Sequence, residues 1–572
     1  MNYTKNQNYG LEFMPTWIFT LANHIPQNAG LDLAFYDTRF DEISSIQSAD
    51  VFLFSGINQD LDQLLIVRKK LKDQYPNALS IIGGPICWSF NEAGDLDLLQ
   101  DFDHIFIGDG EDKIGQLLVD LSNGVKLEHI IRNPIRFDLN QSKPFYKPFL
   151  MEKFNQYYGT VIEVSRGCPF LCEFCDIRIM TDNNRAHNRP VEIIIEEMEF
   201  LIKNGKSQFV LACDNFIGDL VWAEKLVDEI ILMVERIGIQ PNLYTWLTIN
   251  LSKLPRLLKK MRLAGFDLLF IGIESFNVNS LIETAKVQNT KRAIIDDIKT
   301  IQSYGFIIIA GLIFGFDTEE EDMFDVALEG FCASGLLSGD PNFLTALPGT
   351  PLYRRMQLSN RLRSTSDLSS STSTGGAKHI TNIKYLIPKD ILIDGFKHFV
   401  RSYNQGKYQL KRLKIYFENL EVSQNYIPLK KGNDGFSSLG GALTILFKDK
   451  RGFQQLLNRL FSFCRKPTNL YYALLGLLFV VRKTKIKGRF NHFRFWLFAW
   501  SNYIMKYQDI SSNDFDIDSV DENFDYNDII PKGYGETAKE DIPQNKIDAQ
   551  IKSTTKGLQS YIDKKKGKVS QT

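Results

Sequence analysis

The stretch Val164–Ile177, VSRGCPFLCEFCDI, places three of the chain's seven cysteines within eight residues. Cys168, Cys172 and Cys175 have the spacing C-x3-C-x2-C. Thiolates so close together can hold zinc, hold an iron–sulfur cluster or carry out redox chemistry. Structural zinc needs four ligands, and the nearest candidate for a fourth is His187. Three thiolates instead suit a [4Fe-4S] cluster with one iron left open for a substrate or a cofactor.

The segment around these cysteines alternates apolar runs with helical patterns. The expected strands between Gly159 and Met356 read GTVIEVS, SQFVLACD, NLYTWLTI, DLLFIGIES, FIIIAGLIFG and NFLTALPG. Helical stretches such as VEIIIEEMEFLIKNG separate them. Six consecutive strand–helix units predict a partial TIM-like barrel over residues 150–358, whose active site lies at the strand C-termini. The cysteines follow the first strand directly, so they belong to that end.

Residues 1–135 show the same rhythm in a separate unit. The runs LDLAFYD, ADVFLFSG, LSIIGGP and DHIFIGDGE alternate with helical patterns, and the last three end in glycine-bearing turns. This predicts an α/β unit with a doubly wound, Rossmann-like parallel sheet. Ligands of such sheets bind at the carboxyl ends of the strands. The candidate binding positions there are Ser55, Gly56, Gly83, Gly84, Gly108 and Glu111.

The last third of the chain is predicted to be helical and then disordered. Residues 359–380 are rich in Ser and Thr and predict a flexible linker or lid. Residues 381–510 have a helical pattern and are expected to form a helical domain. Residues 511–572 are predicted to be a disordered tail, because residues 511–530 carry seven acidic residues and no basic one.

The overall composition is that of a soluble protein, with 24% charged residues and a formal net charge of −1. This balance gives no general attraction to nucleic acid. Seven cysteines without a repeating framework, and an N-terminus without a signal-peptide pattern, predict a cytoplasmic protein. The most apolar segment, residues 470–505, is too short in its apolar runs to span a membrane. It is expected to form either a buried helix pair or an interfacial anchor in peripheral contact with a membrane.

Several motifs together resemble the radical S-adenosylmethionine superfamily. SRGCPFLCEFCD, Arg189-Pro190, ACDNFIG, LFIGIES with the following SLIETAKVQNT, AGLIFGFDTEEE and LTALPGTPLYRRM occur in the order typical of the subgroup with an N-terminal cobalamin-binding domain. The segment TNIKYLIPKDILIDGFKHFVRSYNQGKYQLKRL resembles the C-terminal extension of a branch that includes hopanoid methylases. The resemblance covers residues from about 20 to about 420.

The resemblance implies a [4Fe-4S] cluster on the three cysteines, with the open iron binding S-adenosylmethionine. The aromatic residue before the last cysteine supports the adenine, and the second strand's end contacts the methionine moiety. The fourth strand's end binds the ribose, and glycines of the fifth let the backbone approach the adenine. The residues implied are Phe174, Asp214, Asn215, Glu274, Ser275, Gly311 and Gly315.

The resemblance also implies cobalamin at the turns of the N-terminal unit. Two features depart from the pattern. The Asp-x-His-x-x-Gly motif of other cobalamin proteins is absent. No strand and proline-rich turn precede the first helical segment, GLEFMPTWIFTLANHIP, so the sheet is expected to be one strand short.

The sequence therefore predicts a cobalamin-dependent radical enzyme that methylates an unactivated carbon of a small or lipid-like substrate. Its electron donor is expected to be a flavodoxin or a ferredoxin, and no catalytic residue beyond the cofactor contacts is identified. One alternative is radical chemistry without methyl transfer, such as cyclisation or oxidation. Another is a non-catalytic iron–sulfur or zinc-binding scaffold.

Overall fold

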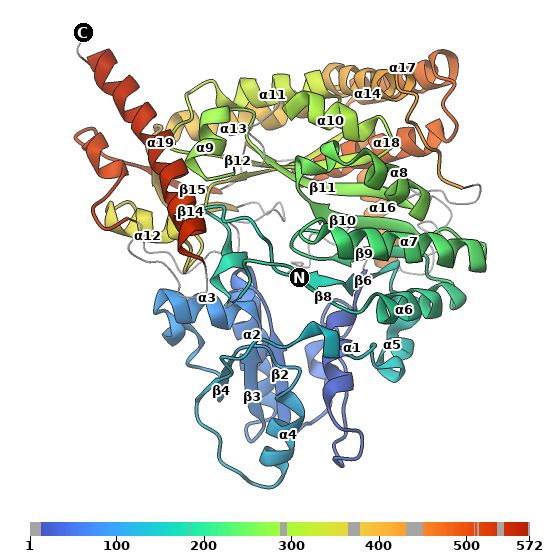
Figure 1. Ribbon diagram of the computed structural model, residues 1–572, viewed down its shortest axis with the longest axis vertical. Coiled ribbons are helices and arrows are strands. Elements are labelled where there is room, and N and C mark those ends of the chain that lie inside the picture. The colour runs from blue at the N-terminus through green and yellow to red at the C-terminus, as the bar shows by residue number, and fades with distance from the viewer. Residues whose placement is uncertain are drawn as a thin grey trace.

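The computed structural model describes residues 13–180, 182–286, 294–363, 378–430, 450–507, 510–511, 514–534 and 543–569. An N-terminal α/β unit lies below a larger α/β sheet, and the C-terminal helices lie above that sheet (Figure 1). The predicted α/β class with parallel sheets and a helical C-terminal region is confirmed.

Among the described residues, the larger sheet contains seven parallel strands, of which the first and last are not paired with each other. In spatial order these are β1 (Phe13–Pro15), β6 (Gly159–Glu163), β9 (Gln208–Ala212), β10 (Asn242–Leu247), β11 (Phe266–Glu274), β12 (Ile307–Phe314) and β13 (Ser338–Phe343). The connecting helices include α6 (Val191–Lys203), α7 (Leu220–Ile237), α8 (Pro255–Ala264), α10 (Ile294–Gln302) and α11 (Met323–Ser334). The sheet is thus a partial barrel with an open side.

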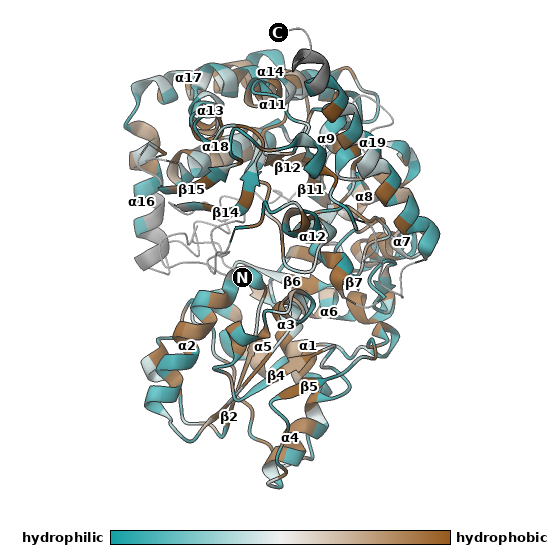
Figure 2. Ribbon diagram, turned by 90° about the vertical axis from the view of Figure 1, so that its left-hand side faces the viewer, coloured by the Kyte–Doolittle hydropathy of each residue, from teal (hydrophilic) through white to brown (hydrophobic). Residues whose placement is uncertain are grey.

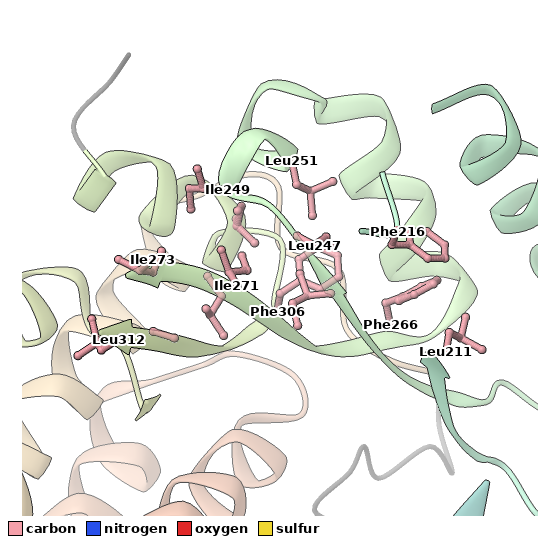
Figure 3. Packing of buried hydrophobic residues seen from close by; sticks show 14 of the residues in the cluster. Leu211, Phe216, Leu247, Ile249, Leu251, Phe266, Ile271, Ile273, Phe306 and Leu312 are labelled. Carbon is pink, nitrogen blue, oxygen red and sulfur yellow. The ribbon is translucent and has the colours of Figure 1, made fainter. Parts of the chain in front are cut away.

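Alternation along the strands sends one set of side chains to the helices and the other set inside. Ile271 and Ile273 of β11 pack in the outer layer with residues such as Leu251 from the helical connections (Figure 3). The last strand is placed differently from the prediction, because it begins at Ser338 and includes Pro341. Proline is tolerated in β13 because this strand lies at the edge of the sheet.

The N-terminal sheet contains β2 (Val51–Ser55), β3 (Leu79–Gly83), β4 (His104–Ile107) and β5 (Ile130–Arg132), parallel and in sequential order. Helices α2 (Leu61–Gln74) and α3 (Pro85–Ala93) cover one face. Helix α4 (Ile114–Ser122) covers the other face, together with Ile25, which follows α1 (Thr16–His24). The predicted strand LDLAFYD is wrong, since Leu31–Asp37 has no strand pairing. The strand that precedes α1 joins the larger sheet beside β6 instead.

The C-terminal helices pack against the partial barrel, partly on its inner side and partly on the connecting helices α10 and α11. They are α13 (Lys389–Asn404), α14 (Gly406–Glu421), α16 (Lys450–Cys464), α17 (Pro467–Lys483) and α18 (Arg489–Lys506). Trp496 and Trp500 of α18 form one buried cluster with Leu268 and Ile307, which are the inward residues near the starts of β11 and β12. Phe493, Phe495, Trp496 and Trp500 are therefore buried, as the buried-helix interpretation predicts.

The predicted disordered tail is wrong for residues 514–534 and 543–569. Strand β15 (Asp514–Ser519) pairs in parallel with β14 (Lys378–Tyr385), and helix α19 (Gln544–Val569) packs against α9 (Val278–Glu283). The acidic run contains the strand alternation DFDIDS, in which Ile517 is buried, and Arg363 pairs with Asp516. Most of the predicted linker, residues 364–377, lies outside the described residues.

Candidate functional site

The three cysteines lie in an irregular loop after β6. The Cys168 amide donates to the Asn183 carbonyl at 3.0 Å, and the Cys175 amide donates to the Cys172 carbonyl at 3.2 Å. Burial, followed by the negative charges of Asp176, Cys172 and Cys168, raises the pKa of Cys175. The three thiols are therefore close enough to interact. No set of three His, Cys, Asp or Glu side chains in the described part of the chain is arranged to hold a metal ion as it stands.

The donor chemistry fits an iron–sulfur cluster better than structural zinc. His187 Nε2 lies 2.6 Å from the Asp182 carbonyl oxygen. His187 belongs to a short strand that pairs with Ser165 and Arg166. Cys213 directs its thiol to Thr245 Oγ1 at 3.3 Å. Neither side chain is thus directed to the cysteine loop as a fourth ligand, so the loop offers three thiols.

The end of β9 brings two of the predicted cofactor contacts to the cysteine loop. Asp214 Oδ2 accepts a hydrogen bond from the Gly167 amide at 2.6 Å, and burial raises the pKa of Asp214 to about 6. Asn215 Nδ2 donates to Cys168 Sγ at 3.9 Å. Asn215 Oδ1 and Thr248 Oγ1 are buried without a hydrogen-bond partner among the described residues. Such orphaned atoms at adjacent strand ends fit a polar ligand.

The end of β11 carries a strained carboxylate and a lysine that the sequence reasoning did not single out. Glu274 has a φ of 66°, a left-handed conformation that is rare outside glycine and is concentrated at functional sites. Lys286 forms a buried ion pair with Glu274, and its Nζ lies 5.8 Å from the centre of the Phe174 ring. Although burial opposes its charge, Glu274 and the nearby thiol of Cys172 raise the pKa of Lys286. Phe174, Glu274 and the cysteine loop therefore meet around Lys286.

The other predicted contacts face protein groups. Ser275 Oγ donates to Glu319 Oε1 at 3.1 Å. Gly311 lies against the Phe270 ring, where an added Cβ would come within 3.0 Å. Gly315 has a φ of 98°, and its added Cβ would come within 2.5 Å of the Tyr385 ring. The close approaches seen at these two glycines are thus made by aromatic side chains.

A buried charge network surrounds Glu173, which lies between two of the cysteines. Arg355 donates Nε to Glu173 Oε1 at 2.7 Å and Nη2 to Glu173 Oε2 at 2.9 Å. Arg355 also pairs with Asp317, and Arg361 donates Nη2 to Asp317 Oδ1 at 2.6 Å. The Asp317 amide donates to Glu283 Oε1 at 3.1 Å. These five side chains are at most 1% exposed, so the network fixes the cysteine loop to three other segments.

Electrostatics within this network separate its two inner acids. Burial, followed by the charge of Asp317, raises the pKa of Glu283 to about 7. Burial also opposes the ionisation of Asp317, yet Arg361 and Arg355 lower its pKa to about 2. Glu283, Asp317 and Arg355 all lie in motifs that carried the family resemblance, although no role had been given to them. The charged residues within these motifs are the feature of the sequence that could have identified the network.

The turns of the N-terminal sheet meet at one edge. An added Cβ at Gly84 would come within 2.5 Å of Ser55 Oγ and 3.2 Å of the Gly56 carbonyl, and the φ of Gly84 is 88°. Gly83, the last residue of β3, pairs with Ser55, the last residue of β2. Gly108 has a φ of 137° and approaches the Asn133 carbonyl closely. The sheet therefore presents backbone and small side chains there.

This edge faces the cysteine loop of the larger sheet. Glu111 forms an ion pair with Arg166, which lies two residues before Cys168 and also donates Nε to Glu163 Oε1 at 2.7 Å. Arg136 donates to Asp109 Oδ1 at 3.1 Å and to Asn183 Oδ1 at 2.8 Å. The strand-end turns of both sheets thus meet across these contacts.

Comparisons with known proteins agree with this arrangement. Residues 162–329 match the model of the Radical SAM superfamily. The chain is 28% identical over 404 residues to the hopanoid C-2 methylase of Rhodopseudomonas palustris, covering 70% of this chain and 72% of that protein. It is 28% identical over 353 residues to an uncharacterised methyltransferase of Synechocystis sp., covering 61% and 63%.

Among solved structures, the fold is similar to that of the cobalamin-dependent S-adenosylmethionine radical enzyme OxsB, with a TM-score of 0.54 and 12% identity. The match covers 97% of this chain and 83% of OxsB. The chain therefore carries a radical SAM domain within a fold similar to that of OxsB, and it is a homologue of a hopanoid C-2 methylase. The resemblance inferred from the motifs is confirmed.

Proposed function

We propose that this chain, which carries a radical SAM domain, is a cobalamin-dependent methyltransferase acting on an unactivated carbon. The observation that carries the proposal is the meeting of two strand-end edges, one bearing the cysteine loop and the other the glycine turns, across the Glu111–Arg166 pair. Methyl transfer between two cofactors requires both to lie near the same substrate. The homology to hopanoid C-2 methylase supports the same reaction class.

The chain's own residues would bind and orient the cofactors. When bound, the [4Fe-4S] cluster, S-adenosylmethionine and cobalamin supply one-electron bond cleavage and a methyl carrier, which side chains cannot supply. Cys168, Cys172 and Cys175 would hold the cluster. Asn215 Oδ1 and Thr248 Oγ1 offer buried acceptors for a polar ligand.

The Glu274–Lys286 pair would orient the same ligand. A buried ion pair beside the Phe174 ring offers a charged group and an aromatic face in one place. At the facing edge, the turns of Ser55, Gly84 and Gly108 would let a flat macrocycle approach the backbone closely. The burial of Asn215, Glu274 and Ser275 at strand ends of the larger sheet would keep water from the reacting atoms.

Transfer of a labelled methyl group tests the proposal. S-adenosylmethionine carrying a ¹³C methyl group, a chemical reductant or flavodoxin, and hydroxocobalamin would be incubated anaerobically with the reconstituted protein and lipid extracts. The expected product gains the labelled carbon, and corrin absorbance stays with the protein on gel filtration. A product that gains no methyl group while 5'-deoxyadenosine forms would assign radical cyclisation or oxidation instead. No cleavage of S-adenosylmethionine at all would leave the scaffold alternative.

A lipid-like substrate is the second part of the proposal, and it rests on the surface of α17. The outer face of α17 exposes Leu470, Tyr471, Leu474, Leu478 and Val481, along about 17 Å of helix. Its other face packs in the core through Gly476 and Val480. A surface helix that is apolar all round departs from the ordinary amphipathic pattern and indicates a further apolar partner. No helix among the described residues is long and apolar enough to cross a membrane.

The charge around this face favours an anionic lipid surface as its partner. Residues 450–507 contain twelve Lys and Arg and no Asp or Glu, whereas the whole chain has a net charge of −1. Arg465 and Lys466 precede α17, while Arg482 and Lys483 end it, so basic residues lie at both ends of the apolar face. This is the pattern of a helix that lies in a membrane interface. The membrane contact predicted for residues 470–505 is thereby narrowed to α17 and its basic ends.

Vesicle flotation tests the membrane contact. The Leu474→Asp/Leu478→Asp variant would be compared with Leu232→Asp, which changes an equally exposed leucine on α7. We expect the wild type and the α7 control to float with vesicles of phosphatidylcholine and phosphatidylglycerol, and the double variant to stay behind. Vesicles of phosphatidylcholine alone should bind less. Equal flotation of all three proteins, or binding to an oligonucleotide instead of vesicles, would contradict the proposal.

A further inference from the structure

The C-terminal segment that was predicted to be disordered reaches the cysteine loop. Helix α19 lies beside α9 in both ribbon views (Figures 1 and 2). Leu171, which precedes Cys172, forms a small buried cluster with Ile547 and Ile551 of α19. Arg178, just after the cysteines, donates Nη1 to the Gln550 side chain at 3.0 Å. The two apolar contacts and the hydrogen bond come from successive turns of one helix face.

A second contact comes from the turn before α19. The Tyr534 hydroxyl donates to Glu173 Oε1 at 2.7 Å. Glu173 is fully buried, and its two oxygens also accept from Arg355. Tyr534 thus completes the charge network of the cysteine loop with a hydroxyl that is 361 residues away in sequence. A charge-assisted hydrogen bond of this kind is among the stronger polar contacts.

Close contacts with α9 hold α19 in place. Ser553 Oγ donates to the Ile282 carbonyl at 2.9 Å, and an added Cβ at Gly557 would come within 2.8 Å of the Glu283 amide nitrogen. Only a residue without a side chain allows so close an approach of helix to backbone. At the other end of the segment, β15 pairs with β14. The segment is therefore anchored both at β15 and along α19.

We propose that residues 514–534 and 543–569 form a strap that holds the cysteine loop in the geometry required for cluster binding. The loop has little regular structure of its own, and three of its members, Leu171, Glu173 and Arg178, contact the strap. Holding a loop in one conformation lowers the entropy lost when its ligand binds. Tyr534 and Ile551 are positioning residues in this account, since they act on the cysteines through Glu173 and Leu171. The link to the cluster rests on the proposed function, whereas the hold on the loop does not.

The test uses the full-length chain with Tyr534→Phe and Ile551→Ala, and Lys552→Ala as the control. Lys552 follows Ile551 and is exposed, and Tyr534→Phe removes a single oxygen, so all variants should fold. Hydrogen–deuterium exchange of the peptide 164–180 would be measured in the apoprotein. We expect about tenfold faster exchange in Ile551→Ala, a smaller increase in Tyr534→Phe and no change in the control, because local opening follows the loss of local contacts.

The second readout is the rate at which a chelator removes iron from the reconstituted proteins. Iron loss should be about fivefold or more faster in both strap variants than in Lys552→Ala. Unchanged exchange would overturn the strap, and faster exchange with unchanged iron loss would overturn its role in cluster retention. If the wild type binds no iron, the proposed function fails, and the exchange measurement alone then decides whether the segment holds the loop.

Discussion

Replacing Arg355 should destabilise the barrel more than any substitution of an exposed arginine. Arg355 has no exposed side-chain surface and binds Glu173, Asp317 and Glu283. In Arg355→Gln, Arg361 still neutralises Asp317, but Glu173 loses both charge-assisted bonds and keeps the Tyr534 hydroxyl. Breaking a buried ion pair by removing one partner costs about 3–5 kcal/mol. We expect the free energy of unfolding to fall by about that amount.

The matched control is Arg354→Gln on the same helix. The Arg354 side chain is exposed, and its described hydrogen bond is to the Gln357 side chain, so its loss should cost about 0.5 kcal/mol or less. Urea unfolding of the apoproteins at constant pH, followed by circular dichroism, measures both changes. The Arg355→Gln/Glu173→Gln variant should recover part of the loss, because it removes the unpaired carboxylate. A cost for Arg355→Gln within about 1 kcal/mol of the control would refute the reasoning.

Three other substitutions follow from burial and backbone geometry. Burial raises the pKa of Glu319 from 4.5 to about 8. As pH rises from 5 to 8, Glu319 therefore keeps its proton in the folded state and loses it in the unfolded state. The free energy of unfolding should fall by at most about 1.4 kcal/mol per pH unit over this range. Glu319→Gln should remove that dependence on pH in urea titrations. Gly167→Ala should lower the melting temperature more than Gly205→Ala, since both have positive φ but only Gly167 faces a carbonyl, that of Arg185. Trp496→Ala should cost about 3–5 kcal/mol in urea unfolding, because Trp496 is fully buried; a cost below about 1 kcal/mol would contradict the core assignment.

Local patterns were enough to predict where the site lies. The cysteine spacing and the apolar run before it placed the loop at a strand end, and the same logic placed Asp214 and Glu274 at other strand ends of the same sheet. Parallel strands with helical connections bring such ends to one edge. These residues could be found because each lies at the end of a strand or within a few residues after it.

Long-range pairing was the part that the sequence could not supply. Lys286 and Arg355 bind carboxylates that are 12 and 182 residues away, and no periodicity indicates such partners. The strand DFDIDS was missed because its acidic composition was taken to indicate disorder, although Phe515 and Ile517 alternate with three aspartates. Strand β1 was missed because three residues are too few to show a periodic pattern. Its pairing with β6 is determined by tertiary contacts.

The central claim is that the cysteine loop supports reductive cleavage of S-adenosylmethionine, and one comparison tests it most directly. Wild type, Cys172→Ala and Cys464→Ala would be reconstituted anaerobically and assayed for 5'-deoxyadenosine with dithionite and hydroxocobalamin. Cys464 is exposed at the end of α16, so its substitution controls for the loss of a thiol. The account predicts 5'-deoxyadenosine from the wild type and from Cys464→Ala, and none from Cys172→Ala. Equal production by all three proteins, or none from a wild type with a full cluster and lipid substrate, would contradict it.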